Sequence, residues 1–127
     1  MNRSGAMDDL LDAFEQLRIA PEEFDHAAHV RVAYAMITRD DFVSACAKYA
    51  VTLRAMAERA GAPEKFNATV TFAFMSMIAE YAVEVASYDE LVSQHPELLS
   101  AGVLERWYSA ERLGSPLARR QFLLPDR

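Results

Sequence analysis

The chain contains few of the residues that cross-link or interrupt a fold. Its 127 residues include one cysteine, four glycines and five prolines. The single cysteine, Cys46, excludes an internal disulfide framework and is typical of a protein from a reducing compartment. No stretch alternates apolar and polar residues with the period of two that marks a half-buried strand. These absences favour a helical fold.

Positive charge and long apolar runs are also scarce. Thirteen Lys and Arg against 19 Asp and Glu give a formal net charge of −6, which argues against nucleic acid or an anionic membrane surface as the main partner. The most apolar stretch, residues 70–86, carries Glu80 and Glu84, so we expect no membrane span. The first residues lead into acidic side chains, so we expect no secretory leader. These features predict a cytoplasmic protein.

Apolar residues make up 52% of the chain and recur with helical spacing along most of it. The length suits one domain with a substantial core, and we expect extended tails at residues 1–6 and 123–127. The expected helices, separated by Pro, Gly or capping residues, cover residues 7–18, 26–38, 42–60, 63–86, 88–95, 96–108 and 109 onward. The sequence thus predicts an all-α, compact single-domain helical bundle over residues 1–127, with short C-terminal helices.

The segment 63–86 is apolar over most of its circumference, so we expect it to be the central helix. Its main apolar arc consists of Phe66, Val70, Phe74, Met77, Ile78, Tyr81 and Val85. The residues expected to face solvent are Thr69, Ser76, Glu80 and Glu84. If the protein is a homodimeric interaction module, its contact face would consist of Met75, Ala79 and Ala82. On the preceding helix the expected buried seam is Phe42, Cys46 or Ala45, Tyr49, Leu53, Met56 and Ala60.

Two histidines, His26 and His29, lie one helical turn apart just after Asp25, which is a good N-cap. At 100° per residue both fall among the apolar residues of their helix, so we expect both imidazoles to point inward. Residues at i and i+3 can reach one point. Because the positive end of the helix dipole disfavours imidazolium, the rings should be neutral, able to accept hydrogen bonds or ligate a metal.

The sequence leaves three interpretations of this histidine pair open. The rings line a ligand pocket, or they act as a general base or as ligands of a divalent metal, or they are core histidines satisfied by hydrogen bonds. Two imidazoles supply half of a usual metal coordination shell, and no third ligand stands at a fixed spacing.

Asn67 is a second polar residue on an apolar arc, with Thr71 one turn later. An inward Asn amide needs partners, and His26 or His29 would serve if the two helices pack side by side. Alternatively, Asn67 lies at the helix start, where it caps the backbone or faces water. The inward interpretation predicts a polar pocket lined by His26, His29, Asn67 and Thr71 that binds a small molecule or ion.

The C-terminal part of the chain carries Trp107 and Tyr108 close to Arg106 and Arg112. Such a group can stack on an anion or clamp it, which makes Tyr108 and Arg112 candidate ligand-binding residues. Alternatively, this is a closing segment whose aromatic rings cover the bundle and whose arginines are solvated or salt-bridged.

Four segments, taken in order, resemble those of an uncharacterised family of small bacterial all-helical proteins. They read HxxHVRxAY at residues 26–34, GAPEKFNATVT at 61–71, HPELL at 95–99 and YSxERLxSxxAR at 108–119. The resemblance covers the chain from about Phe24 onward and implies a polar site built from the first, second and fourth segments. It also implies that the position of Asn67 is usually His and that of Ala28 often Asp. If relatives bind a metal through three histidines, this chain lacks one ligand and would bind the metal weakly or not at all.

Overall fold

The computed structural model describes residues 3–127, with side chains from residue 9 onward. The four longer helices are α1 (Arg3–Glu15), α2 (His26–Arg39), α3 (Phe42–Arg59) and α4 (Ala68–Ala82). The short helices are α5 (Tyr88–Gln94), α6 (Ala110–Leu113) and α7 (Pro116–Arg120). Single 3-10 turns are η1 (Pro21–Glu23), η2 (Pro63–Lys65), η3 (Pro96–Leu99) and η4 (Val103–Arg106). No strand occurs within residues 3–127, so the predicted all-α fold is confirmed.

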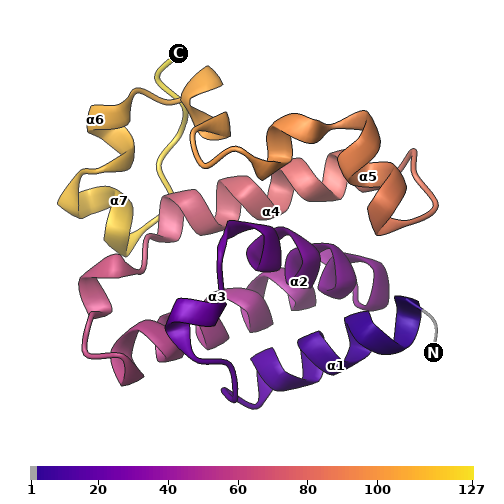
Figure 1. The fold of residues 1–127 in the computed structure, drawn as a ribbon. Helices are drawn as coiled ribbons and strands as arrows, with labels where there is room; N and C mark the ends of the chain where they lie inside the picture. The colour runs from indigo at the N-terminus through magenta and orange to yellow at the C-terminus, as the bar shows by residue number, and fades with distance from the viewer. Residues whose placement is uncertain (1–2) are drawn as a thin grey trace.

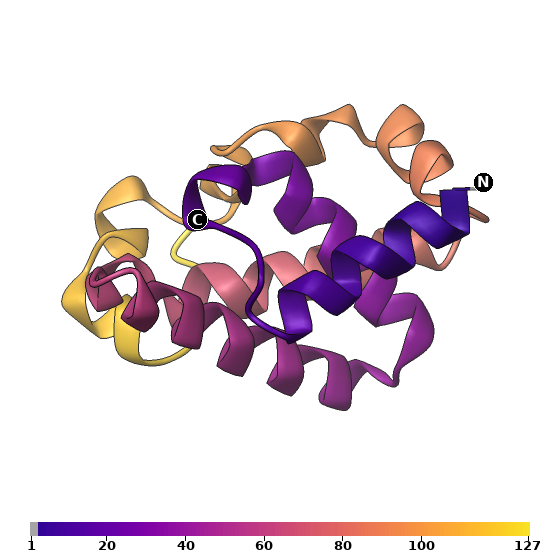
Figure 2. The ribbon, with the colours of Figure 1, turned by 60° about the horizontal axis from the view of Figure 1, so that its bottom comes forward.

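Helix α4 runs through the middle of the molecule (Figure 1). Helices α1, α2 and α3 lie on one side of it, and α5, α6 and α7 lie on the other. Direct contacts join α4 to α2, α3 and α7. In the turned view of Figure 2, α3 forms the lower edge and the orange segment from α5 to η4 the upper edge, with α2 between them. The predicted central position of the fourth long helix is thus confirmed.

A side-chain oxygen caps the start of six helices by accepting a hydrogen bond from a backbone N–H three residues later. The capping residues are Asp25, Asp41, Asn67, Ser87, Ser109 and Ser115. The cap at Asp25 was predicted from the sequence and fixes the place where the histidine helix begins.

The fourth helix is shorter than the predicted span of 63–86. Phe66 and Asn67 adopt extended backbone angles, with ψ of 134° and 110°, so the turn that follows Pro63 ends before α4 begins. At its other end α4 stops at Ala82, and residues 83–87 form a turn. The end of α3 is as predicted, because Gly61 takes a left-handed φ of +74° just after the helix.

The first helix also differs from its predicted span of 7–18. It ends at Glu15, since Leu17 has a φ of 57°, which a right-handed helix does not contain. Residues 3–6, expected in a tail, belong to α1, while residues 1 and 2 lie outside the described part. Residues 123–127 are non-helical as expected, but Leu123 is buried, so this end is packed onto the bundle.

The burial of α4 departs from prediction at two positions. Phe74, Met77 and Ile78 are buried as expected and Tyr81 is half-buried. Met75, expected on a homodimer face, is 0% exposed because α4 is covered on both sides. Met75 therefore cannot contribute to such a face, whereas Ala79 and Ala82 are half-buried. The homodimer itself stays a prediction.

Thr69 is the other correction on α4, since it was expected at the solvent and is 0% exposed. Its hydroxyl donates to the carbonyl oxygen of Gln121 at 2.6 Å and accepts from the N–H of Leu123 at 3.0 Å. The C-terminal segment therefore covers a face of α4 that was expected, from its polar residues, to be exposed to solvent.

On α3 the buried seam begins later than predicted. Phe42 is 46% exposed, whereas Ala45, Cys46, Tyr49 and Met56 are buried. Leu53 is half-buried and Ala60 is exposed. Of the helices described, none is long and apolar enough to cross a membrane.

The buried ring of Phe74 provides a test of this arrangement. We expect Phe74→Ala to lower the free energy of unfolding by about 3–5 kcal/mol, because it opens a cavity beside α2. Urea denaturation followed by circular dichroism would measure the loss. Phe42→Ala is the matched control, since its ring is 46% exposed, and it should cost less than about 1 kcal/mol. Equal losses for the two variants would contradict a central α4.

Candidate functional site

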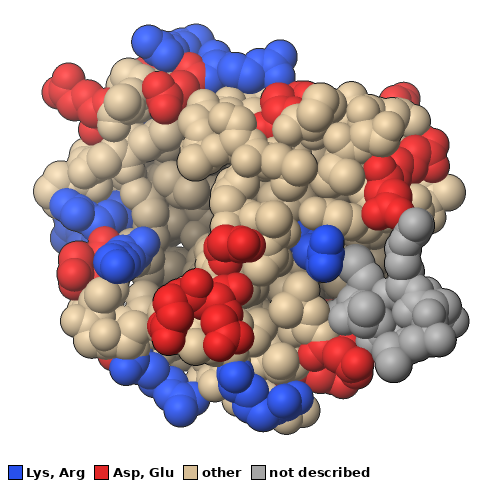
Figure 3. Space-filling view, viewed as in Figure 1, with Lys and Arg blue, Asp and Glu red and all other residues tan. Residues whose placement is uncertain are grey.

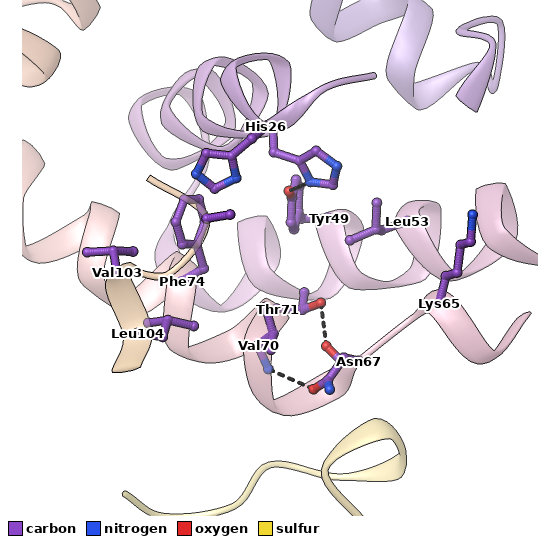
Figure 4. A pocket seen from close by; sticks show the side chains of 12 residues that line it. His26, Tyr49, Leu53, Lys65, Asn67, Val70, Thr71, Phe74, Val103 and Leu104 are labelled. Atoms are coloured by element: carbon purple, nitrogen blue, oxygen red, sulfur yellow. Dashed lines mark hydrogen bonds between the residues drawn. The ribbon is translucent and has the colours of Figure 1, made fainter. Parts of the chain in front are cut away.

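A cavity of about 270 Å³ lies between α2, α3 and α4. Figure 3 shows the molecular face of Figure 1 hollowed over the start of α4. The lining residues come from three helices and two connecting segments: His26, His29, Tyr49, Leu53, Lys65, Asn67, Val70, Thr71, Phe74, Ala101, Val103 and Leu104. The four residues predicted for a polar pocket, His26, His29, Asn67 and Thr71, thus line one cavity. Figure 4 shows His26, Asn67 and Thr71 in its wall.

His26, the first residue of α2, is held by a backbone carbonyl. Its Nε2 lies 2.8 Å from the carbonyl oxygen of Leu98, and a carbonyl can only accept, so Nε2 carries the proton. In the neutral ring Nδ1 then keeps its lone pair, for which the described chain offers no donor. The ring also packs against Phe74, with centroids 5.4 Å apart. His26 can therefore offer an acceptor.

His29 is paired with a buried phenol. Its Nδ1 lies 3.0 Å from the hydroxyl of Tyr49, which is 1% exposed. No other partner of this hydroxyl occurs within residues 3–127, and a buried O–H needs an acceptor. Tyr49 therefore donates to Nδ1, and the proton of neutral His29 is on Nε2.

Burial, with a smaller contribution from nearby His26, lowers the pKa of His29 to about 4, against an opposing effect of Asp25. Burial also raises the pKa of Tyr49. Both members of the pair are consequently neutral at pH 7. The ring of His29 is neutral as the sequence predicted, although burial rather than the helix dipole is the main cause.

Asn67 lines the cavity, but its amide serves the backbone. Its Oδ1 accepts from the N–H of Val70 at 2.9 Å, and its Nδ2 donates to the carbonyl oxygen of Leu113 at 2.6 Å. Thr71 donates its hydroxyl to the carbonyl oxygen of Asn67 at 2.7 Å. Although α2 and α4 are in contact, the expected pairing of Asn67 with His26 or His29 is absent. The capping interpretation applies instead.

Tyr108 and Arg112, the other candidate binding residues, do not line this cavity. The hydroxyl of Tyr108 donates to the carbonyl oxygen of Leu123 at 2.8 Å, and Nε of Arg112 donates to that of Leu124 at 2.7 Å. The carboxylate of Asp126 accepts from both the N–H and the hydroxyl of Ser109 at 2.7 Å. These contacts match the alternative of a closing segment, because they attach the chain end to the bundle.

The donor set of the cavity does not suit a divalent metal. Within the described residues no group of three or more His, Cys, Asp or Glu is placed to hold one. Moreover, ligation through Nε2 of His29 would move its proton to Nδ1 and leave the hydroxyl of buried Tyr49 without an acceptor.

Lys65 is the site residue that the sequence analysis missed. Of the described residues that line the cavity, it is the only Lys, Arg, Asp or Glu, and it is exposed. A wider groove of about 660 Å³ adjoins the cavity and shares His29, Leu53 and Lys65 with it. The groove lies between η1, α3 and η2, so no local pattern in the sequence indicates it.

No family model, curated protein or solved structure matches this chain. The resemblance drawn from the four sequence segments therefore stays a prediction.

The depressed pKa of His29 predicts a specific pH dependence of stability. Unfolded His29 takes up a proton near its ordinary pKa of 6.5, whereas folded His29 does so only near 4. Between these values the unfolded state binds more protons, so the free energy of unfolding should fall as pH falls, by up to about 1.4 kcal/mol per pH unit. Urea denaturation at several pH values would measure this slope.

The variant His29→Gln isolates that contribution from those of the carboxylates. Its stability deficit relative to the wild type should be largest near neutral pH and shrink as pH falls towards 4. A deficit independent of pH, or an NMR titration of the His29 ring near its ordinary pKa, would contradict the neutral, half-buried ring.

The two hydrogen bonds of the Asn67 amide give a second prediction for the site. We expect Asn67→Ala to lower the free energy of unfolding by about 1–3 kcal/mol, since it removes a cap and leaves the carbonyl of Leu113 unpaired. Ser87→Ala removes only a cap, at the N–H of Glu90, and should cost about 1 kcal/mol. If chemical denaturation gives Asn67→Ala the smaller loss, the structural role of Asn67 is wrong.

Proposed function

We propose that this protein binds a small, largely apolar molecule with one anionic group in the cavity between α2, α3 and α4. The observation that carries the proposal is the composition of the cavity wall. Apolar side chains make up most of it, His29 is neutral at pH 7, and Lys65 supplies a positive charge at the rim. Ligand pockets commonly combine apolar walls with a few polar groups that orient the occupant.

The cavity and the adjoining groove suit different parts of such a molecule. The groove is lined by apolar residues that include Phe24, Met56 and Phe66, which suit a hydrocarbon portion. Its one carboxylate, that of Glu22, is exposed. Lys65 and His29 line both the cavity and the groove. The ammonium of Lys65 and the Nε2–H donor of His29 are therefore available where the cavity meets the groove. A carboxylate or phosphate placed there would find donors without displacing the bonds from His26 to Leu98 or from Tyr49 to His29.

Catalysis by these histidines has weaker support. A general base works best with a pKa near the operating pH, and the pKa of His29 is about 4. His26 donates its Nε2 proton to a backbone carbonyl. The alternative of a homodimeric interaction module is weakened because Met75, one of the residues expected at its contact face, is buried in the core. The free thiol of Cys46 supports the proposal that the binding protein works in the reducing cytoplasm.

Titration with sodium hexanoate, monitored by amide NMR shifts, tests the proposal. We expect saturable shifts at Leu53, Lys65 and Val70, and weaker binding of hexanamide, which has no charge. Lys65→Gln should raise the Kd about fivefold, the effect of losing a partly exposed ion pair worth about 1 kcal/mol. Benzoate and hexyl phosphate extend the test to other apolar anions.

Lys48→Gln is the matched control, because Lys48 is the other lysine of the chain and lies on α3 outside the cavity. It should leave the Kd for hexanoate unchanged. Shifts that map outside the cavity, an equal effect of both lysine variants, or no binding of hexanoate, benzoate or hexyl phosphate would overturn the proposal.

A further inference from the structure

A second hollow, of about 230 Å³, lies between α4 and residues 104–125. Four aromatic residues line it together with one acidic residue and a few small or apolar ones: Tyr81, Trp107, Tyr108, Phe122, Glu80, Ala73, Ser76, Met77, Leu104 and Pro125. Leu104 also lines the first cavity, so the two hollows lie on either side of this side chain. We propose that the second hollow binds a small organic cation of the quaternary ammonium type.

The charge of the hollow is the first argument for a cation. Of the described residues that line it, Glu80 is the only acidic one, and no Lys or Arg is among them. Its carboxylate forms no hydrogen bond or ion pair with another described residue. The charge of this carboxylate therefore repels an anion and attracts a cation.

The aromatic rings are the second argument. The face of an aromatic ring attracts a cation, most strongly when the ring is Trp or Tyr, and quaternary ammonium groups are recognised by several rings together. One of these rings, Trp107, already contacts a cation of the protein itself. The guanidinium of Arg106 lies over the Trp107 ring, 5.1 Å from its centroid, and Arg106 is not among the lining residues.

The walls of the hollow are held in place before any ligand arrives. The backbone is fixed on both sides of Phe122, because Gln121 and Leu123 bond the hydroxyl of Thr69. The hydroxyl of Tyr108 donates to the carbonyl oxygen of Leu123, and the Tyr81 ring stacks on His95 with centroids 4.0 Å apart. A preorganised wall reduces the entropy lost on binding.

The size of the hollow favours a small occupant. Its volume of about 230 Å³ lies below the range of ~300–1,000 Å³ typical of pockets for drug-sized ligands. A strongly hydrated metal ion would find one carboxylate here, which is too few oxygen ligands. A cation whose charge is spread over methyl groups suits both the apolar rings and the single carboxylate.

The chain has a built-in probe for this test, since Trp107 is its only tryptophan. Titration with tetramethylammonium chloride and with choline chloride should change its fluorescence saturably, with a Kd of roughly 1–10 mM. The neutral isostere of choline, 3,3-dimethyl-1-butanol, should bind at least about tenfold more weakly. Sodium chloride at equal ionic strength controls for screening.

Phe122→Ala should raise the Kd for tetramethylammonium roughly threefold to thirtyfold, the range expected when one cation–π contact is lost. Phe122→Leu keeps the apolar volume and should weaken binding as well. Phe42→Ala is the matched control, because Phe42 and Phe122 are both 46% exposed and Phe42 lies on α3. Glu80→Gln should weaken binding, whereas Glu84→Gln should not.

Three results would each overturn the proposal. They are equal affinity for choline and its neutral isostere, no effect of Phe122→Leu in a folded variant, and no saturation by about 100 mM tetramethylammonium. The test is independent of the first cavity, since Phe122→Ala should leave the binding of hexanoate unchanged.

Discussion

Helix α4 is apolar on nearly all sides, and keeping it from water constrains the rest of the fold. Helices on one side cannot cover it alone, so the chain must also pack its later segments against the opposite face. The consequence is visible at Met75 and Thr69, both 0% exposed although they lie on different parts of the helix surface. The first cavity and the second hollow both lie against this helix.

Burying polar residues beside such a helix requires partners for each of them. Among the described residues, no fully buried side-chain nitrogen or oxygen lacks a hydrogen bond. The partners are mostly backbone carbonyls at segment ends, as for His26 with Leu98 and Asn67 with Leu113. The same bonds that satisfy these groups attach η3 and α6 to the bundle. The hydrogen bonds of the polar side chains in this interior thus hold connecting segments in position. They leave ring nitrogens of the histidines available to a ligand.

The two hollows differ in charge although α4 contributes to both walls. Lys65 lies at the rim of the first, and Glu80 at that of the second. Successive turns of one helix can contribute to both because side chains a few residues apart point in different directions. For example, Phe74 lines the first hollow and Ala73 the second. If both proposals hold, the bundle would carry an anion site and a cation site on either side of Leu104.

Local patterns in the sequence were enough to predict the helical class, the central helix, the cap at Asp25 and the pocket position of His26 and His29. These depend on apolar periodicity and on capping chemistry within a few residues. Only the tertiary structure decided that Thr69 is buried, that Asn67 bonds Leu113, and that Tyr108 and Arg112 attach the chain end. The partners of these residues lie between 12 and 54 residues away along the chain. Such pairings depend on how distant segments pack on α4. The spacing of apolar residues within one helix carries no information about that packing.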